Sequence, residues 1–199
     1  MIQRSLVLLK PDAIMRGVIG EIITRFEKAG LKIVGVKFIN ADLEVVKKHY
    51  QKDKLWHKRV GDLNVKDCEM FGLDAFDIFG TIDPVDIGKQ VNEWLYRMFD
   101  LGPVMSFVFE GPNAVAKIRV LVGSTYPDSA PAGTIRGDFG LDSAVSSMKR
   151  KRGVLNLIHA SGTSEEAEEA EEAEEEIKLW FKDSEILKYK RVYEGLYSY

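Results

Sequence analysis

Short apolar stretches with strand character alternate with amphipathic helices in a fixed order, which constrains the fold of this chain more than any other feature. Residues 5–9 form a short apolar run that is typical of a buried strand, and Pro11 ends it. Residues 18–29 carry apolar side chains at helical spacing, and Gly30 suits the position after the last turn. Residues 31–39 alternate like a strand. The chain therefore predicts a strand–helix–strand unit.

The same order returns later in the chain. Residues 103–109 predict a strand, residues 113–122 a helix, and residues 156–158 a last strand with a long helix behind it. Residues 42–50 predict a short helix between the two units. This order matches an α+β, ferredoxin-like split βαβ sandwich, with an antiparallel four-stranded sheet and helices on one face plus an insertion.

The 199 residues are expected to form a single domain, 1–199, with two unusual segments. Residues 51–100 are too long for a plain connection, and their aromatic and apolar content favours a folded, inserted subregion. Residues 164–180 contain a Glu/Ala run that predicts a helix with a solvated acidic face.

Composition narrows the function classes. The formal net charge of −3 gives no overall attraction to nucleic acid or to an anionic membrane. A lone cysteine, Cys68, fits a reducing cytoplasm, and the apolar run at residues 6–9 is too short for a signal peptide or a membrane span. In the expected loop 143–153, the basic run 149–152 favours solvated charge over a contact with nucleic acid or phosphate. The sequence predicts a cytoplasmic, soluble protein.

The position of His159 in the sequence is explained better by a catalytic role than by a structural one. It follows the apolar end of a strand, and Thr163 and Glu166 have the spacing of a capping box at the start of a helix. A helix N-terminus attracts anions, and an imidazole is a nucleophile that can attack phosphorus. The alternative is a hydrogen-bonded structural histidine.

Four cationic residues stand at the ends of predicted elements. Lys10 closes the first strand, Arg119 lies on the helix at 113–122, and Arg136 lies in a glycine-rich turn. The fourth, Arg16, precedes Gly17 and could equally be a surface residue. Each alone is more typical of a solvated side chain or an ion pair. Together with His159, however, they share one explanation, which is a polyanionic ligand.

Several motifs in this order make the chain resemble the nucleoside diphosphate kinases. They are Leu9-Lys10-Pro11-Asp12, Arg16-Gly17, His49-Tyr50, Gly102-Pro103-Val104, Gly133-Thr134-Ile135-Arg136-Gly137-Asp138-Phe139 and Asn156-Leu157-Ile158-His159-Ala160-Ser161. The resemblance implies a ping-pong transfer of the terminal phosphate from a nucleoside triphosphate such as ATP to a diphosphate such as GDP, through a phosphohistidine. It also implies Mg²⁺ on the nucleotide phosphates and a homo-oligomer, with a hexamer favoured over a tetramer.

The resemblance also implies roles for individual residues. His159 would be the nucleophile, flanked by Tyr50 and oriented with the help of Ser161, and Lys10 would neutralise the transferring phosphoryl group. The outer phosphates and the ribose would be held by Arg119, Thr125, Arg136 and Asn156.

The chain departs from the family pattern at three places. Gly162 stands where the family has Asp. For the glutamate that orients the histidine, counting back from residues 177–180 gives Glu176, whereas counting forward from the histidine gives Ala170; we choose Glu176, with Glu169 and Glu172 on the same face.

The third departure concerns the aromatic residue that stacks on the base. Counting back from Gly102 gives Val91 at its place and Leu95 as its apolar partner. Trp94 is a possible replacement, but a place in the core of the insertion is favoured for the insertion's aromatic residues.

Two other functions remain as alternatives. One is a catalytically weak nucleotide-binding or assembly module with the same fold, against which the joint retention of Lys10, Arg119, Arg136, Asn156 and His159 argues. The other is a ferredoxin-like RNA-binding domain that uses residues 149–152, but the strand pattern of exposed aromatic residues that such domains need is missing.

Overall fold

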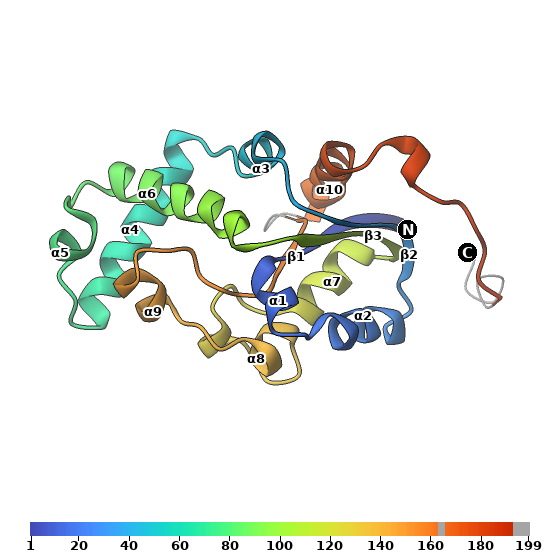
Figure 1. Ribbon diagram of the computed structural model, residues 1–199, viewed down its shortest axis with the longest axis horizontal. Coiled ribbons are helices and arrows are strands. Elements are labelled where there is room, and N and C mark those ends of the chain that lie inside the picture. Colours follow the sequence, from blue (N-terminus) through green and yellow to red (C-terminus); the bar gives the residue numbers. More distant parts are fainter. Residues whose placement is uncertain (163–165, 193–199) are drawn as a thin grey trace.

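A four-stranded antiparallel sheet organises the protein, here described from a computed structural model (Figure 1). The structure describes residues 1–162 and 166–192, and of residues 166–169 it describes the helical backbone alone. The strands lie in the order β2-β3-β1-β4. Their bounds are β1 Ile2–Leu9, β2 Lys32–Ile39, β3 Val104–Pro112 and β4 Ile158–Ala160.

The helices surround this sheet and extend beyond one end of it (Figure 1). The α-helices are α1 Pro11–Met15, α2 Ile19–Lys28, α3 Leu43–His49, α4 Lys54–Met70, α5 Ala75–Phe79, α6 Pro84–Arg97, α7 Ala114–Val122, α8 Ile135–Phe139, α9 Ala144–Lys149 and α10 Glu166–Trp180. Short 3-10 helices are η1 Met98–Leu101, η2 Pro127–Ser129 and η3 Asp183–Glu185. The predicted strands at 5–9, 31–39 and 103–109 and the predicted helices at 18–29, 42–50 and 113–122 are confirmed within a few residues.

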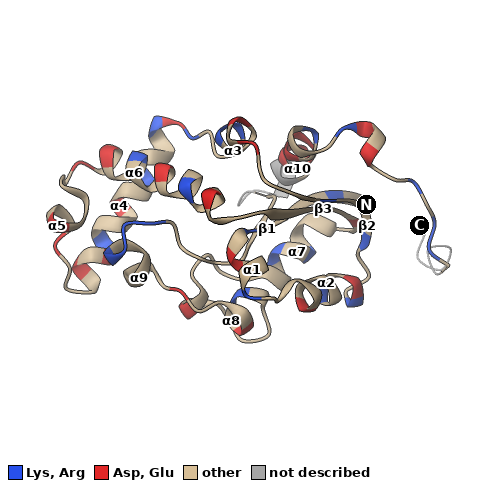
Figure 2. Cartoon of the chain, viewed as in Figure 1, with Lys and Arg blue, Asp and Glu red and all other residues tan. Residues whose placement is uncertain are grey.

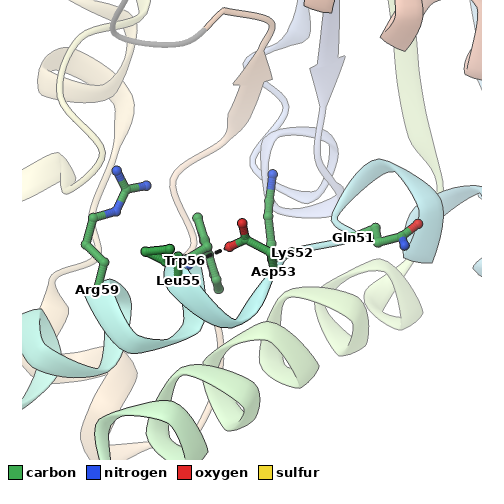
Figure 3. A pocket seen from close by; sticks show the side chains of 6 residues that line it. All are labelled: Gln51, Lys52, Asp53, Leu55, Trp56 and Arg59. Carbon is green, nitrogen blue, oxygen red and sulfur yellow. Dashed lines mark hydrogen bonds between the residues drawn. The ribbon is translucent and has the colours of Figure 1, made fainter.

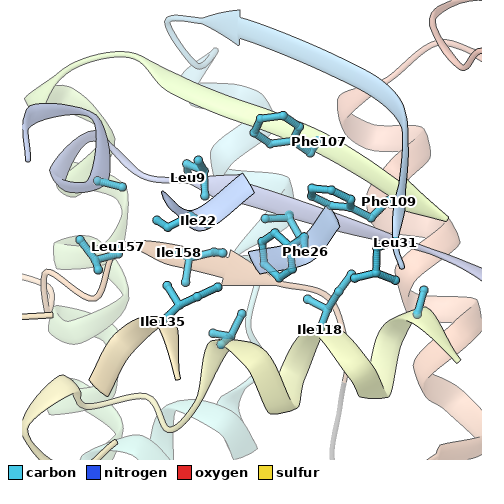
Figure 4. Close-up of a cluster of buried hydrophobic side chains, with 14 residues drawn as sticks. Leu9, Ile22, Phe26, Leu31, Phe107, Phe109, Ile118, Ile135, Leu157 and Ile158 are labelled. Carbon is cyan, nitrogen blue, oxygen red and sulfur yellow. The ribbon is translucent and has the colours of Figure 1, made fainter. Parts of the chain in front are cut away.

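Both faces of the sheet bury apolar side chains, because alternate residues of a strand point to opposite sides. On β1, Val7 and Leu9 join a core formed with α2 and α7, drawn in Figure 4. Leu6 and Leu8 join a second core, to which α3 and α10 contribute. The expected fold class is confirmed, and helices cover the second face as well, where the sequence placed helices on one face alone.

The predicted inserted subregion at 51–100 contains α4, α5 and α6, which lie beyond the end of the sheet (Figure 1). Two glycines let α4 and α6 approach closely. A Cβ added to Gly61 would lie 1.8 Å from the carbonyl oxygen of Pro84, and one added to Gly88 would lie 2.0 Å from that of His57. Larger residues at these positions would force the helices apart. Within the described part of the chain, no helix is both long and apolar enough to cross a membrane.

Two sequence-based expectations need correction. The last strand was predicted at 156–158 but lies at Ile158–Ala160, because Leu157 has a left-handed backbone with φ of 69° and its N–H donates to Asp12 Oδ2 rather than to a strand. The loop expected at 143–153 contains helix α9, whose first turn is capped by Ser143 Oγ. The capping residue expected at Thr163 lies outside the described residues.

Candidate active site

His159 lies at the centre of β4, opposite Leu8 of β1. Its side chain remains 20% exposed, so that a ligand can reach it. The turn before it is held by the hydrogen bond from the Leu157 N–H to Asp12, a buried carboxylate on α1. A short strand entered through a fixed turn therefore presents the imidazole at the edge of the sheet.

The carboxylate of Glu176 on α10 orients this imidazole. Its Oε2 lies 3.0 Å from His159 Nε2 and 2.5 Å from Ser161 Oγ, which donates to it. Ser161 is fully buried and its Oγ also accepts the backbone N–H of Leu6. Burial alone would raise the pKa of Glu176, but the neighbouring His159, reinforced by His49 and the Ser161 hydroxyl, lowers it to about 2. A carboxylate ionised at neutral pH therefore faces the histidine.

Two aromatic residues from the end of α3 pack beside His159. The His49 ring lies edge-on to it with 4.3 Å between centroids, and the Tyr50 ring lies 5.9 Å away. Burial, with the charge of His159, lowers the pKa of His49 to about 3, so His49 is neutral at pH 7. Burial also raises the pKa of Tyr50, helped by Glu176. The donor atoms of His49, His159 and Glu176 lie within 4.8 Å of one another, close enough to hold a metal ion.

A buried polar pair lies at the end of β1. The Lys10 ammonium donates to Asn156 Oδ1 at 2.5 Å, and the amide of Asn156 donates in turn to the carbonyl oxygen of Thr125 at 2.8 Å. Burial lowers the pKa of Lys10 to about 8, against the opposing effect of Asp12, and the charge of Arg136 lowers it further. The structure thus brings together three sequence-predicted residues, although Thr125 takes part through its backbone.

Arg136 of α8 is tied to the same region by backbone carbonyls. Its Nε donates to Asn156 at 3.2 Å and its Nη2 to Ile158 at 2.7 Å, while Nη1 donates to Gly123 and Ser124. These bonds occupy four of the five N–H groups of the guanidinium. Burial lowers the pKa of Arg136 to about 10. The side chain therefore joins the loop after α7 to both ends of the turn that precedes His159.

Arg119 of α7 completes the set of cations. Its Nη1 donates to the carbonyl oxygen of Gly162, two residues beyond β4. Gly162 has φ of 121°, and a Cβ there would meet Val115 at 2.9 Å and Arg119 at 3.0 Å. A glycine is therefore required where the family pattern has Asp. The charge of Arg119 also acts on the pKa of Arg136, so these cations share one region.

Two sequence-predicted residues point elsewhere. Val91 on α6 packs against a cluster that the insertion forms with α9, and Leu95 packs against the core shared by α3 and α10. Trp94 is also buried in the insertion, where its ring stacks on Phe79 with 5.4 Å between centroids. The sequence offered two other glutamates for this contact. For Glu169 only the helical backbone is described, and Glu172 lies one turn before Glu176.

A cavity of about 520 Å³ that was not predicted from the sequence lies at the start of α4. It is lined by Gln51, Lys52, Asp53, Leu55, Trp56 and Arg59. Figure 3 shows Lys52, from the segment before α4, and Arg59, from α4, extending to the same side of this helix. Lys52 lies 6.0 Å from the Trp56 ring, and its charge acts on the pKa of both His49 and Glu172. The signal was an aromatic residue between two cations, just after His49-Tyr50.

An imidazole, the carboxylate that contacts it and several cations thus converge beside a cavity with an aromatic wall. This arrangement suits the transfer of a group from one polyanion to another, because the cations can stabilise phosphate charge while the imidazole forms a covalent bond.

Comparisons with known proteins agree with this chemistry. The family model described as nucleoside diphosphate kinase matches residues 3–59 and 85–186. A nucleoside diphosphate kinase from Pyrobaculum aerophilum is 41% identical over 187 residues, which cover 94% of this chain and 99% of the relative. The family match leaves out residues 60–84, whereas this relative aligns along almost its whole length.

Solved structures give the same result for the backbone. The crystal structure of an NDP kinase from Pyrobaculum aerophilum is similar with a TM-score of 0.87 at 40% identity, covering 94% of this chain and 100% of that one. A transition-state mimic of nucleoside-diphosphate kinase from Borrelia burgdorferi, with bound vanadate and ADP, has a TM-score of 0.74 at 34% identity, covering 98% and 96%.

Proposed function

The chain belongs to the nucleoside diphosphate kinase family, and we propose that His159 is the residue that carries the phosphoryl group in its reaction. The protein is a phosphotransferase that moves the terminal phosphate of a nucleoside triphosphate to a nucleoside diphosphate. The observation that carries the proposal is the 3.0 Å contact between Glu176 Oε2 and His159 Nε2. An ionised carboxylate keeps the proton on Nε2, which leaves the lone pair on Nδ1 as the nucleophile.

The reaction then proceeds in two half-reactions, in each of which one bond to phosphorus forms as another breaks. Nδ1 of His159 bonds to the terminal phosphorus while the bond from that phosphorus to the bridging oxygen breaks, and the diphosphate leaves with the electron pair. A terminal oxygen of the second diphosphate then attacks the phosphohistidine, and the electrons of the P–N bond return to Nδ1. Glu176 stabilises the positive charge that the ring carries between the two steps.

The cations would stabilise phosphate charge throughout. Lys10 and Arg136 lie on either side of Asn156, and both contact it. Burial lowers the pKa of both residues because it destabilises their charged forms. A bound polyanion would offset part of that destabilisation. We expect Arg119 and Thr125 to hold the outer phosphates, and Asn156 to contact the ribose.

The nucleotide base would stack on Trp56 rather than at Val91. Trp56 lines the cavity beside the site, whereas Val91 faces the cluster that the insertion forms with α9. Aromatic stacking accepts every base, because each base has a π-face. Together with Lys52 and Arg59, the ring offers a platform for a base and charge for its phosphates.

Phosphoryl transfer needs a divalent cation on the nucleotide phosphates, and we expect Mg²⁺. The residues around His159 fit a metal that arrives on the nucleotide. Lys10, Arg119 and Arg136 would attract the phosphates, and Mg²⁺ commonly binds through substrate phosphates and keeps several waters. When bound, Mg²⁺ neutralises charge on the phosphoryl oxygens.

We further propose that the protein forms a homo-oligomer, with a hexamer favoured over a tetramer. Strand β2 is at the edge of the sheet, and its Val36 and Phe38 are 51% and 60% exposed. An exposed apolar edge strand invites pairing with another strand, and a second copy of the chain would cover it.

Cytoplasmic location is expected, without membrane or nucleic-acid partners. Arg152 of the basic run makes a bidentate ion pair with Asp142, at 2.5 and 3.1 Å. Figure 2 shows acidic and basic residues interspersed over the helices. A surface of mixed sign gives little attraction to a nucleic-acid backbone.

Incubation with terminally labelled ATP and Mg²⁺ tests this function. The chain should acquire acid-labile, alkali-stable phosphate that GDP discharges as GTP. His159→Ala should abolish the labelling, whereas His57→Ala, which changes a histidine on α4, should retain it. Equal labelling of His159→Ala would refute the proposed nucleophile. An unlabelled wild-type chain would instead favour the nucleotide-binding or assembly module.

A further inference from the structure

Two imidazoles and one carboxylate face a common point beside β4. His49 Nδ1 lies 3.6 Å from Glu176 Oε1, and His159 Nε2 lies 3.0 Å from Glu176 Oε2. The three donor atoms that converge lie within 4.8 Å of one another. In a tetrahedral zinc site with bonds of about 2.0–2.1 Å, neighbouring ligand atoms are about 3.3 Å apart. The two contacts with the Glu176 carboxylate, at 3.0 and 3.6 Å, are close to this spacing, and the donor atoms as a set lie within 4.8 Å.

One contact in this group is unfavourable without a cation. The indole N–H of Trp180 donates to His49 Nδ1 at 3.3 Å, and an indole nitrogen can only donate. Nδ1 of the neutral His49 must therefore carry a lone pair. That lone pair lies beside a carboxylate oxygen, with no hydrogen available between the two atoms. A metal ion placed between them would take the place of the Trp180 hydrogen on Nδ1 and would also bind the carboxylate oxygen.

We propose that His49, His159 and Glu176 form an inhibitory transition-metal site that binds Zn²⁺. Two imidazoles and a carboxylate suit Zn²⁺, whereas Mg²⁺ prefers oxygen ligands. The remaining exposure of His159 gives the ion access, and water or a phosphate oxygen would complete the coordination. The metal displaces the long hydrogen bond from Trp180.

Inhibition follows from the tautomer of His159 and rests on the proposed function. Catalysis requires the proton on Nε2 and the lone pair on Nδ1. Zn²⁺ takes the lone pair of Nε2, so the one proton of the neutral ring moves through solvent to Nδ1. Nδ1 then has no lone pair with which to attack phosphorus. The metal thus blocks the nucleophile without occupying the phosphate-binding cations.

The test uses the nucleotide-free, full-length chain and Zn²⁺ itself. Competition with a chromogenic chelator should give one zinc per chain, and His49→Gln should weaken binding by at least about tenfold. His57→Gln is the matched control and should bind as the wild type does. In parallel, Zn²⁺ should slow labelling of the wild type by ATP, and a chelator should restore it. Each variant is compared with its own rate without zinc.

A measurement on the wild type keeps the test decisive if His49→Gln does not fold. The chain has three histidines, and their imidazole signals can be followed by NMR during a zinc titration. The signals of His49 and His159 should shift together at one equivalent, while that of His57 should not. Absence of saturable one-to-one binding, a shift confined to His57, or equal binding by His49→Gln would overturn the proposal.

The two proposals fail separately. If zinc does not bind but exchange between ATP and GDP still depends on His159, the metal site is refuted and the proposed nucleophile stands. If zinc shifts both histidines but His159→Ala keeps full exchange, the metal site stands and the proposed nucleophile is refuted.

Discussion

The carboxylate of Glu176 lies 3.0 Å from Nε2 of His159, although 17 positions separate the two residues. Strand β4 and helix α10 bring them together, and Ser161 holds the same carboxylate oxygen at 2.5 Å. A charged acceptor beside one ring nitrogen favours the tautomer with the proton on that nitrogen, which in the proposed reaction leaves the other nitrogen to attack.

Replacing Glu176 with Gln tests this contact. The amide removes the charge and cannot accept both the His159 and Ser161 hydrogens as well as the carboxylate does. A charge-assisted hydrogen bond contributes about 1.5–3 kcal/mol, so phosphohistidine formation should slow by about ten- to a hundredfold. Rapid-quench measurement with labelled ATP gives this rate directly.

Glu175→Gln is the control, because Glu175 is the neighbouring exposed residue and changes charge equally. It should label at nearly the wild-type rate. Comparable losses in both variants would mean that the net charge of the helix matters, rather than the contact with His159.

Counting back from residues 177–180 chose Glu176, and packing explains why this residue lies beside His159. Ile177 and Trp180 are buried against the sheet and fix the rotation of α10 from its C-terminal end. Counting back from them therefore follows the helix. Counting forward from His159 crosses residues 163–165 and then the Glu/Ala run. No periodicity fixes how long that run is.

The titration of Lys10 should make the activity fall as the pH rises. Burial lowers its pKa from 10.5 to about 8. Below pH 8 the free enzyme carries the charge that attracts phosphate, and above it the ammonium loses its proton. The ratio kcat/KM for ATP, which reports on the free enzyme, should therefore fall as the pH rises through 8.

Lys10→Arg tests whether Lys10 is the group that titrates, because a guanidinium stays protonated over this pH range. Its kcat/KM should be lower at pH 7, since the Asn156 contact changes, but should remain level through pH 9. A decline with the same midpoint in both proteins would assign the titration to another group.

Periodicity predicted the long elements because each buries a regular face, as Ile22 and Phe26 do on α2. It failed at β4, where three residues carry too little pattern and a left-handed Leu157 displaces the strand by two positions. The base site stays a prediction. Counting back from Gly102 gives Val91, which is partly buried against a cluster that the insertion forms with Ala144 and Met148 of α9.

Trp56 should carry much of the affinity for the base. Stacking of a base on an aromatic ring contributes about 1–3 kcal/mol, so Trp56→Ala should raise the KM for ATP by about five- to a hundredfold. Trp56→Phe keeps an aromatic face and should stay within a few-fold of the wild type. Steady-state kinetics with ATP and GDP would measure both. An unchanged KM in Trp56→Ala would place the base elsewhere.

Replacing Gly162 with Ala should destabilise the protein. The φ of 121° at Gly162 and the Cβ contacts of 2.9 Å to Val115 and 3.0 Å to Arg119 combine backbone strain with overpacking. Gly133 has φ of 88° but open space around it, so Gly133→Ala isolates the strain. The left-handed conformation costs about 1–2 kcal/mol and overpacking about 1–3 kcal/mol more. Urea unfolding should therefore give Gly162→Ala the larger loss of unfolding free energy, and equal losses would show that Val115 and Arg119 yield without cost.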